Sequence, residues 1–214
     1  MIKIDIHVHT KYSRDSLLEL KTISKLCSRK GIIPVISDHN SLKGALQYRK
    51  LFKDCIVGEE INTSQGEITA LFLNNEIPSG LDIDATIDRI REQDAVLYVP
   101  HPFDSLRRET IKTSALSRIK PDIIEVFNSR TVLSASNKMA KEFAIKNKYL
   151  KGVGSDAHTG REIGNAFAAV EDFNLDSKKD FLRNLKDAKF YCRKSGLAVH
   201  AVTFFEKRLK LVRK

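Results

Sequence analysis

Residues 2–10, read IKIDIHVHT, decide the fold. Apolar and polar residues alternate through this stretch, and a period of two is typical of a β-strand. Residues i and i+2 of a strand point to the same face, so His7 and His9 lie side by side. At a separation of about 6 to 7 Å along the strand, two imidazoles can both reach one metal ion. The stretch therefore predicts a strand that carries a pair of candidate metal ligands.

Strands and helices are expected to alternate from this first strand onward. Further strands are predicted at residues 32–36, 54–57, 68–73, 95–99, 121–127, 150–154 and 165–170. Helices are predicted at residues 17–27, 41–52, 83–93, 105–119, 132–148 and 177–188. Such alternation with short linkers implies parallel strands in an α/β fold. Polar residues stand at the end of nearly every strand, which favours a barrel with its site at that face over a doubly wound open sheet.

The bulk composition is that of one domain with a basic surface. The 214 residues have a formal net charge of +10, which favours polyanionic partners such as nucleic acid, nucleotides or phosphorylated metabolites. We expect a single domain over residues 1–214, with residues 198–214 as a basic amphipathic C-terminal helix. That helix either packs on the barrel or contacts nucleic acid or an anionic surface.

The cysteines and the apolar runs bear on location. Three scattered cysteines without a C-x-x-C motif indicate a reducing compartment, and no apolar run approaches the roughly 20 residues of a membrane span. The N-terminus enters a strand at once, so we expect no signal peptide. We predict a cytoplasmic protein without a membrane span.

Histidines and carboxylates gather at the predicted strand ends. Five of the six histidines occupy such positions: His7, His9, His39, His101 and His158. The carboxylates at or near strand ends are Asp38, Glu60 and Asp156, with Asp15 and Glu67 close by. Imidazole and carboxylate together suit Zn²⁺, Mn²⁺ or Fe²⁺. The set exceeds one closed zinc site and suffices for two or three ions that share a bridging carboxylate, for which Glu60 fits best.

Six short motifs give the chain a resemblance to the polymerase and histidinol phosphatase (PHP) domain family. They are HVHTKYSRDS from residue 7, SDHNSLKGA at 37–45, GEEINT at 58–63, HPF at 101–103, EVFNSR at 125–130 and GSDAH at 154–158. They follow the order of the family and cover about residues 1 to 170. The resemblance implies a distorted (β/α)7 TIM-like barrel with two or three divalent metal ions at its C-terminal rim.

The resemblance also implies a set of ligands. By motif, these are His7, His9, Asp15, His39, Glu60, His101, Asp156 and His158. Family members often carry a further histidine ligand at the start of the strand after G-x-E, where this chain has Glu67. Glu67 either serves as a carboxylate ligand or leaves the site one ligand short, so the number of ions stays open.

The expected chemistry is the hydrolysis of a phosphate ester of a nucleotide or small phosphometabolite. A metal-bound water that loses its proton near neutral pH would attack phosphorus in line. Asp38, His39 and His158 are the candidates for proton relay or catalysis. Candidate substrate-binding residues are Lys11, Arg14, Asn128, Arg130 and Arg161. Arginine is the better bidentate phosphate ligand.

Two alternatives stay open beside this prediction. One is a nuclease that acts on short RNA or DNA ends, which the charge supports although no aromatic and basic residues interleave as in single-strand binders. The other is a non-catalytic nucleic-acid-binding or scaffold subunit, against which the nearly complete set of ligands counts. The sequence fixes neither the substrate, nor the metal, nor the oligomeric state.

Overall fold

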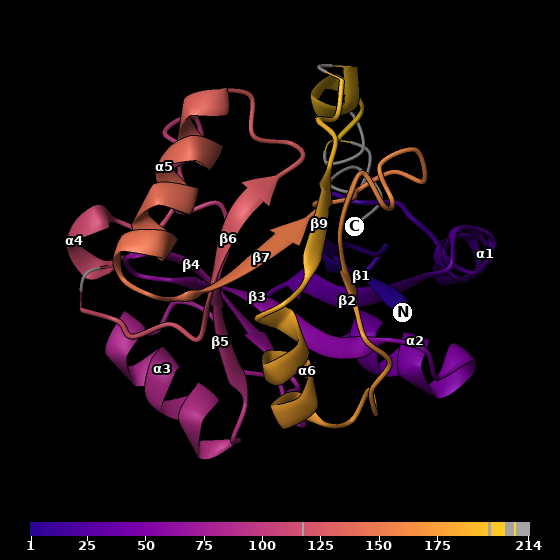
Figure 1. Cartoon of the computed structure of the whole chain (residues 1–214), viewed down its shortest axis with the longest axis horizontal. Helices are drawn as coiled ribbons and strands as arrows, with labels where there is room; N and C mark the ends of the chain where they lie inside the picture. Colours follow the sequence, from indigo (N-terminus) through magenta and orange to yellow (C-terminus); the bar gives the residue numbers. More distant parts are fainter. Residues whose placement is uncertain (117, 197, 204–207, 209–214) are drawn as a thin grey trace.

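The structure is a barrel-shaped sheet with helices around it (Figure 1). This computed structural model describes residues 1–116, 118–196, 198–203 and 208. Within them, nine strands form one sheet in the order β7-β6-β5-β4-β3-β2-β1-β8-β9. The strands are β1 (Ile2–Val8), β2 (Ile32–His39), β3 (Ile56–Thr63), β4 (Gly66–Leu71), β5 (Val96–Val99), β6 (Ile123–Asn128), β7 (Leu150–Gly154), β8 (Ala166–Val170) and β9 (Lys189–Cys192).

The barrel closes between its first and seventh strands. Ala157, which follows β7, accepts a hydrogen bond from the His9 N–H at 2.9 Å and donates one to the His7 carbonyl at 3.4 Å. The sheet is therefore nearly closed, and the predicted distorted TIM-like barrel is confirmed. β8 pairs with residues 2–4 at the edge of β1 opposite β2, the same edge that Ala157 meets further along the strand, and β9 lies beyond β8.

The expectation of parallel strands throughout was wrong for four neighbouring pairs. β3 and β4 form an antiparallel hairpin, β4 is antiparallel to β5, and β8 is antiparallel to both β1 and β9. The cause in the first case is the connection: β3 returns through a tight turn in which Gly66 has φ +122° and lies too close to the Ile111 backbone for a side chain. Because β4 begins where β3 ends, Glu67 lies opposite Asn62 at the rim of the barrel.

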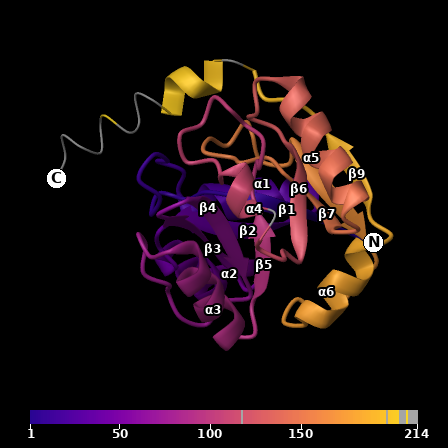
Figure 2. The ribbon, with the colours of Figure 1, turned by 90° about the vertical axis from the view of Figure 1, so that its left-hand side faces the viewer.

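Helices cover the outside of the barrel (Figure 2). They are α1 (Leu20–Lys30), α2 (Lys43–Phe52), α3 (Ile83–Glu92), α4 (Thr113–Leu116), α5 (Ser134–Lys146) and α6 (Lys178–Leu185). The predicted helix at 105–119 was wrong except for α4, since Asp104 caps turns at Leu106 and Arg107. β9 was not predicted. Residues 198–203 are helical, and the rest of the predicted C-terminal helix lies outside the described residues apart from residue 208.

The barrel interior is apolar towards the lower end, which α6 closes, and polar towards the upper end, where the parallel strands have their carboxyl-terminal ends. Ile4 and Ile6 share one buried cluster with side chains from β2 to β6 and β8, and Phe181 of α6 closes the lower end. Val8 instead packs in the cluster beneath the outer helices. The pairing register of β1 shifts between Asp5 and Val8, so a bulge exchanges the two faces of the strand. This bulge turns His7 and His9 into the barrel above the apolar layer.

No helix among the described residues combines the length and the apolar character needed to cross a membrane.

Candidate metal centre

His7 and His9 face each other through their Nε2 atoms, which lie 3.0 Å apart. The Nδ1 atom of His7 is 3.1 Å from Glu125 Oε1, and that of His9 is 3.1 Å from Ser13 Oγ. A neutral imidazole that donates through Nδ1 presents a lone pair at Nε2, so both lone pairs point at the same place. Two converging lone pairs repel each other unless a cation lies between them. Ligand bonds of about 2.0 to 2.2 Å place neighbouring ligand atoms at about this separation.

Glu60 occupies the middle of the cluster. Its Oε2 atom lies 3.3 Å from His7 Nε2, 3.4 Å from His9 Nε2 and 3.2 Å from His39 Nδ1. Its other oxygen, Oε1, lies 3.2 Å from His101 Nε2. One carboxylate thus faces two groups of imidazoles, which is the arrangement that a bridging ligand requires. The predicted bridging role of Glu60 is consistent with this position.

Glu67 points into the same centre. Its Oε1 atom is 3.3 Å from His39 Nδ1 and accepts a hydrogen bond from Asn62 Nδ2 at 2.9 Å, while Oε2 is 3.9 Å from His101 Nε2. The carboxylate therefore stands on the side of Glu60 that faces His101. Residues His39, Glu60 and Glu67 hold ligand atoms close enough to share one ion.

A third group lies towards the rim. Asp15 contacts His158 Nε2 at 3.2 Å through Oδ1 and His39 Nε2 at 3.5 Å through Oδ2. His158 donates through Nδ1 to the Asp156 carbonyl at 2.8 Å, so its Nε2 lone pair faces Asp15. Asp156 connects this group to the first, because its Oδ1 atom is 3.2 Å from His9 Nε2.

Several buried ligand atoms lack a hydrogen-bond partner among the described residues. They are Asp15 Oδ1, His39 Nδ1 and Asp156 Oδ1. Buried polar atoms are normally paired, so each exception needs an explanation. A divalent cation satisfies all three, because each atom faces other ligand atoms at ion-pair distance. The donor set of imidazoles and carboxylates fits borderline divalent metals.

The electrostatics of the buried cluster favour cations. Burial alone would lower the pKa of His7, but the carboxylates of Glu60, Asp156 and Glu125 outweigh it and hold that pKa well above its usual value. Burial alone would raise the pKa of Glu60, but His7 and His39 lower it well below its usual range. The Glu60 carboxylate is thus held ionised in an interior that would otherwise neutralise it.

Two of these residues adopt unusual backbone conformations. His101 has φ 30° and Asp156 has φ 53°, which non-glycine residues rarely adopt. The main-chain N–H of His101 donates to Glu125 Oε2 at 2.7 Å, and this bond helps to hold the conformation. Strain of this kind concentrates at functional sites, where the surrounding structure enforces it.

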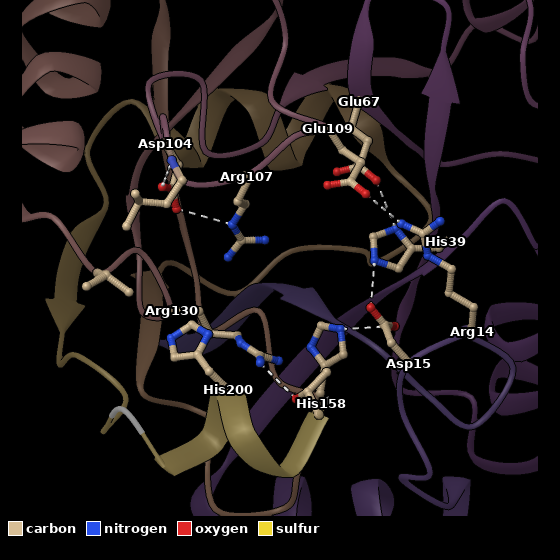
Figure 3. Close-up of a pocket in the computed structure, with 13 residues that line it drawn as sticks. Arg14, Asp15, His39, Glu67, Asp104, Arg107, Glu109, Arg130, His158 and His200 are labelled. Carbon is tan, nitrogen blue, oxygen red and sulfur yellow. Dashed lines mark hydrogen bonds and ion pairs between the residues drawn. The ribbon is translucent and has the colours of Figure 1, made fainter. Parts of the chain in front are cut away.

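A cavity of about 260 Å³ opens above the cluster (Figure 3). Asp15, His39, Glu67 and His158 line its inner side, while His7, His9 and Glu60 are buried behind them. The basic side chains around it are Arg14, Arg107, Arg130 and His200. A cationic wall opposite a cluster of ligands suits an anion held against metal ions.

Each arginine of this wall has a partner. Arg107 Nη2 donates to Asp156 Oδ2 at 2.6 Å and its Nε to Asp104 at 3.2 Å. Arg14 pairs with Glu109 at 3.2 Å. Arg130 is buried, lies 3.6 Å from Glu162 and donates through Nη2 to Thr203 Oγ1 at 2.8 Å, but its Nη1 has no partner among the described residues. That atom is itself buried, so Arg130 contributes its charge to the cavity wall without an exposed free donor at Nη1.

Four predicted site residues lie away from the cavity. Lys11 pairs with Glu19 at the surface, and Arg161 lines a separate cavity beside Leu26. Asn128 is buried, and its amide donates to Glu125 and Asp156, so it positions ligands instead of meeting a substrate. Asp38 is also fully buried.

The hydrogen bonds that Asp38 makes do not agree with the role in proton relay that was predicted for it. Its Oδ1 atom accepts from the Thr10 N–H at 2.6 Å and Oδ2 accepts from the Thr10 hydroxyl at 2.7 Å. Both oxygens are therefore occupied by the residue that follows His9. Asp38 fixes the end of β1 and so the position of the His9 ring.

Among the basic residues that line the cavity, Arg107 and His200 were not predicted from the sequence. Arg107 was predicted to lie in a helix that does not form. The turn that brings Arg107 to Asp156 was therefore not predicted. His200 was set apart because it follows no strand, yet the helical residues 198–203 carry it over the rim beside Arg130 (Figure 3).

Comparisons with known proteins agree with this geometry. Residues 135–190 match the model of a family described as PHP-associated. A protein of Methanocaldococcus jannaschii, described as uncharacterized protein MJ0417, is 40% identical over 195 residues, which cover 86% of this chain and 79% of the relative.

Solved structures share the fold at low sequence identity. A two-domain protein of Bacteroides vulgatus, described as containing a predicted PHP-like metal-dependent phosphoesterase, superimposes with a TM-score of 0.70 at 19% identity, over 96% of this chain and 69% of that one. The lesion-specific endonuclease EndoQ of Pyrococcus furiosus gives a TM-score of 0.60 at 19% identity, over 87% of this chain and 56% of that one.

Fold and centre together define a barrel protein with a buried histidine and carboxylate cluster suited to divalent metals. The chain belongs to the PHP family.

Proposed function

We propose that the protein is a metal-dependent hydrolase of phosphate esters, acting on a nucleotide or a small phosphometabolite. The observation that carries the proposal is the convergence of the Nε2 atoms of His7 and His9, 3.0 Å apart, beside the carboxylates of Glu60 and Asp156. The membership of the PHP family supports it, as does the description of the Bacteroides protein that shares the fold.

Three groups of side chains would hold two or three divalent ions. His7, His9, Glu60 and Asp156 form the first group, and Glu60, Glu67, His39 and His101 the second. Asp15 and His158 complete a third with His39 or His9. Zn²⁺, Mn²⁺ and Fe²⁺ all suit these donors. When bound, such ions would supply Lewis acidity and lower the pKa of water to near neutrality.

The residues of the cavity wall would bind and orient the ester. Arg130 would contribute positive charge at the cavity wall, and its position is fixed by Glu162 and Thr203. Arg107 adds positive charge next to Asp156. Because these arginines are held by carboxylates, they enter the complex with little loss of side-chain entropy. The helical residues 198–203 would limit access of water and of large groups from one side.

We assign His158 and His39 to metal binding in preference to acid catalysis. The Nδ1 atom of His158 is occupied by the Asp156 carbonyl, so its Nε2 lone pair is directed at the cluster. A proton for the leaving group would have to come from a side chain on the open side of the cavity. His200 lies there, and burial together with Arg130 and Arg107 lowers its pKa.

Elemental analysis and a Glu60→Gln variant test the proposal. The wild-type protein, loaded with Mn²⁺ or Zn²⁺ and desalted, should retain at least two ions per chain and hydrolyse p-nitrophenyl phosphate. Glu60→Gln should keep the circular dichroism spectrum and lose both an ion and turnover, because an amide lacks the charge to bridge two cations. A folded wild-type protein that retains close to no metal would refute the proposal.

A nuclease that acts on nucleic-acid ends is the second candidate. The net charge of +10 and the shared fold with the endonuclease EndoQ favour it. Hydrolysis of bis-p-nitrophenyl phosphate and of short oligonucleotides, compared with nucleoside monophosphates under the same metal load, separates diester from monoester chemistry. The limited size of the cavity leads us to expect faster hydrolysis of the monoesters.

A further inference from the structure

A basic groove lies on the outside of the barrel, away from the metal centre. It has a volume of about 620 Å³ and runs between α5 and β9 over the outer face of β6 and β7. Figure 1 shows β6 and β7 in view between α5 and β9. The groove exists because β7 is followed by a loop and the antiparallel strand β8 instead of a covering helix.

The groove has an apolar floor and a rim of lysines. Val126, Phe127, Val153 and Phe190 form the floor. The lysines are Lys138, Lys141, Lys151 and Lys194, and no acidic side chain stands among the described residues that line the groove. Lys138 lies 3.9 Å from Glu142 along α5, and Lys194 donates to the Val132 carbonyl. The surface is therefore apolar in the middle and cationic at both sides.

One wall of the groove is the free edge of the sheet. β9 is the last strand and pairs with β8 alone. Arg193 N–H donates to the Asn165 carbonyl at 2.7 Å, which makes this pair hydrogen-bonded. Hydrogen-bonded and non-bonded pairs alternate in an antiparallel ladder. Phe190 and Cys192, opposite Ala168 and Ala166, consequently direct their main-chain N–H and C=O groups away from β8, towards the outer edge of β9, and both residues line the groove.

We propose that the groove binds an extended, acidic segment of a partner protein, which adds to β9 as a further strand. Such a segment would pair with the main-chain groups of Phe190 and Cys192, as peptides do when they extend a sheet. Its carboxylates would meet Lys141 and Lys151, and an apolar side chain two residues away, on the same face of the added strand, would cover the floor.

Charge argues against the other occupants. A second copy that paired edge to edge would bring two rims of lysine together, and like charges on free edges are a known safeguard against such pairing. Residues 204–214 of this chain carry five basic side chains and one acidic one, so they too would be repelled. A nucleic-acid strand would satisfy the lysines, but it would leave the outward main-chain groups of β9 without matching partners.

Binding of designed probes to the full chain tests the proposal. A fluorescent nine-residue peptide in which glutamate and valine take turns at every second position, with threonine between them, presents both side chains on one face and should bind in an anisotropy titration. The same peptide with lysine in place of glutamate should not bind. The Lys141→Glu/Lys151→Glu variant should weaken binding at least about tenfold. Lys21→Glu/Lys25→Glu on α1, which changes the net charge equally at exposed positions away from the groove, should change it less than about twofold.

Amide hydrogen exchange tests the pairing itself. The bound peptide should slow exchange at Phe190 and Cys192 and leave Tyr191, which already bonds to β8, unchanged. Cys192→Pro should weaken binding and preserve the β8–β9 ladder, since proline is tolerated where the lost N–H faces outward from an edge strand. Three outcomes would each overturn the proposal. They are an equal loss of peptide affinity in the two double variants, equal protection from exchange at Phe190, Tyr191 and Cys192, and tighter binding of a nine-nucleotide oligothymidine than of the acidic peptide.

Discussion

Replacement of Gly44 by alanine should destabilise the protein through Asp38, although alanine is the better helix former. A Cβ atom added at Gly44 in α2 would lie 1.9 Å from Asp38 Oδ2 and 2.6 Å from Thr10 Oγ1. A carboxylate oxygen cannot approach a methyl carbon closer than roughly 3.2 Å, so Asp38 would have to move by more than about 1 Å. That movement breaks its two hydrogen bonds to Thr10.

The magnitude follows from these two bonds. Hydrogen bonds to a charged group contribute about 1.5 to 3 kcal/mol each, so their loss costs about 3 to 6 kcal/mol. Alanine in place of glycine returns about 1 kcal/mol of helix propensity. We therefore expect Gly44→Ala to lower the free energy of unfolding by about 2 to 5 kcal/mol. Burial, opposed by the bonds to Thr10, raises the pKa of Asp38 to about 6, so pH 8 keeps the carboxylate ionised.

A double-mutant cycle with Asp38→Ala is the decisive assay. In the Asp38→Ala background the obstructing oxygen is gone and the Thr10 hydroxyl can rotate, so Gly44→Ala should become neutral or stabilising by up to about 1 kcal/mol. Urea unfolding of the four proteins at pH 8 gives the coupling free energy. An equal loss in both backgrounds, or no loss in the wild type, would refute the role assigned to Asp38.

Three further outcomes are expected. Maleimide should label Cys192 alone in the native protein, because Cys192 is exposed whereas Cys27 and Cys55 are buried and burial raises the pKa of Cys55 to about 12. Burial also raises the pKa of Cys192 to about 11, so its labelling should be slow at neutral pH and faster at pH 8.5; two or more labels per native chain would contradict the packing. Removal of metal with EDTA should lower the free energy of unfolding, and Mn²⁺ at 100 times its dissociation constant should restore about 2.7 kcal/mol per independent site in urea titrations, whereas an unchanged midpoint would count against binding to the folded state. Glu67→His should bind as much metal as the wild type or more, with turnover within about tenfold, since Glu67 already faces His39 and His101; a folded variant with fewer ions would show that the carboxylate itself is needed.

The first strand illustrates what the sequence could predict and what it could not. Alternation placed His7 and His9 on one face, and the structure puts their Nε2 atoms 3.0 Å apart. The same alternation also puts Asp5, two residues before His7, on that face of the strand. Asp5 instead accepts hydrogen bonds from the Ser155 and Gly164 N–H groups, at 2.9 Å in each case. The bulge that separates these outcomes depends on pairing with β2, a non-local property that periodicity in one strand does not contain.

The other residues of the metal centre also divide into those whose position the sequence could predict and those whose position it could not. Polar residues at strand ends predicted which ligands would meet, because the topology of a barrel brings those ends to one rim. The antiparallel course of β4, which aims Glu67 inward, depends on the tight turn at Gly66, and the predicted alternation of strands and helices does not contain that turn. Arg107 and His200 lie on a turn and on residues 198–203, whose paths are set by distant contacts with Asp156 and Arg130.

The closure of the barrel has a consequence for how the chain folds as it is made. β1 emerges first, yet Asp5 receives its hydrogen bond from Ser155, which is 150 residues further along. At about 5 to 20 residues per second, a ribosome needs roughly 8 to 30 s to cover that distance. During this interval the His7 and His9 pair is already outside the ribosome without Asp156 and His158. The centre can therefore be completed only late in synthesis, so any ion taken up early is held by part of its ligands and remains exchangeable until the seventh strand docks.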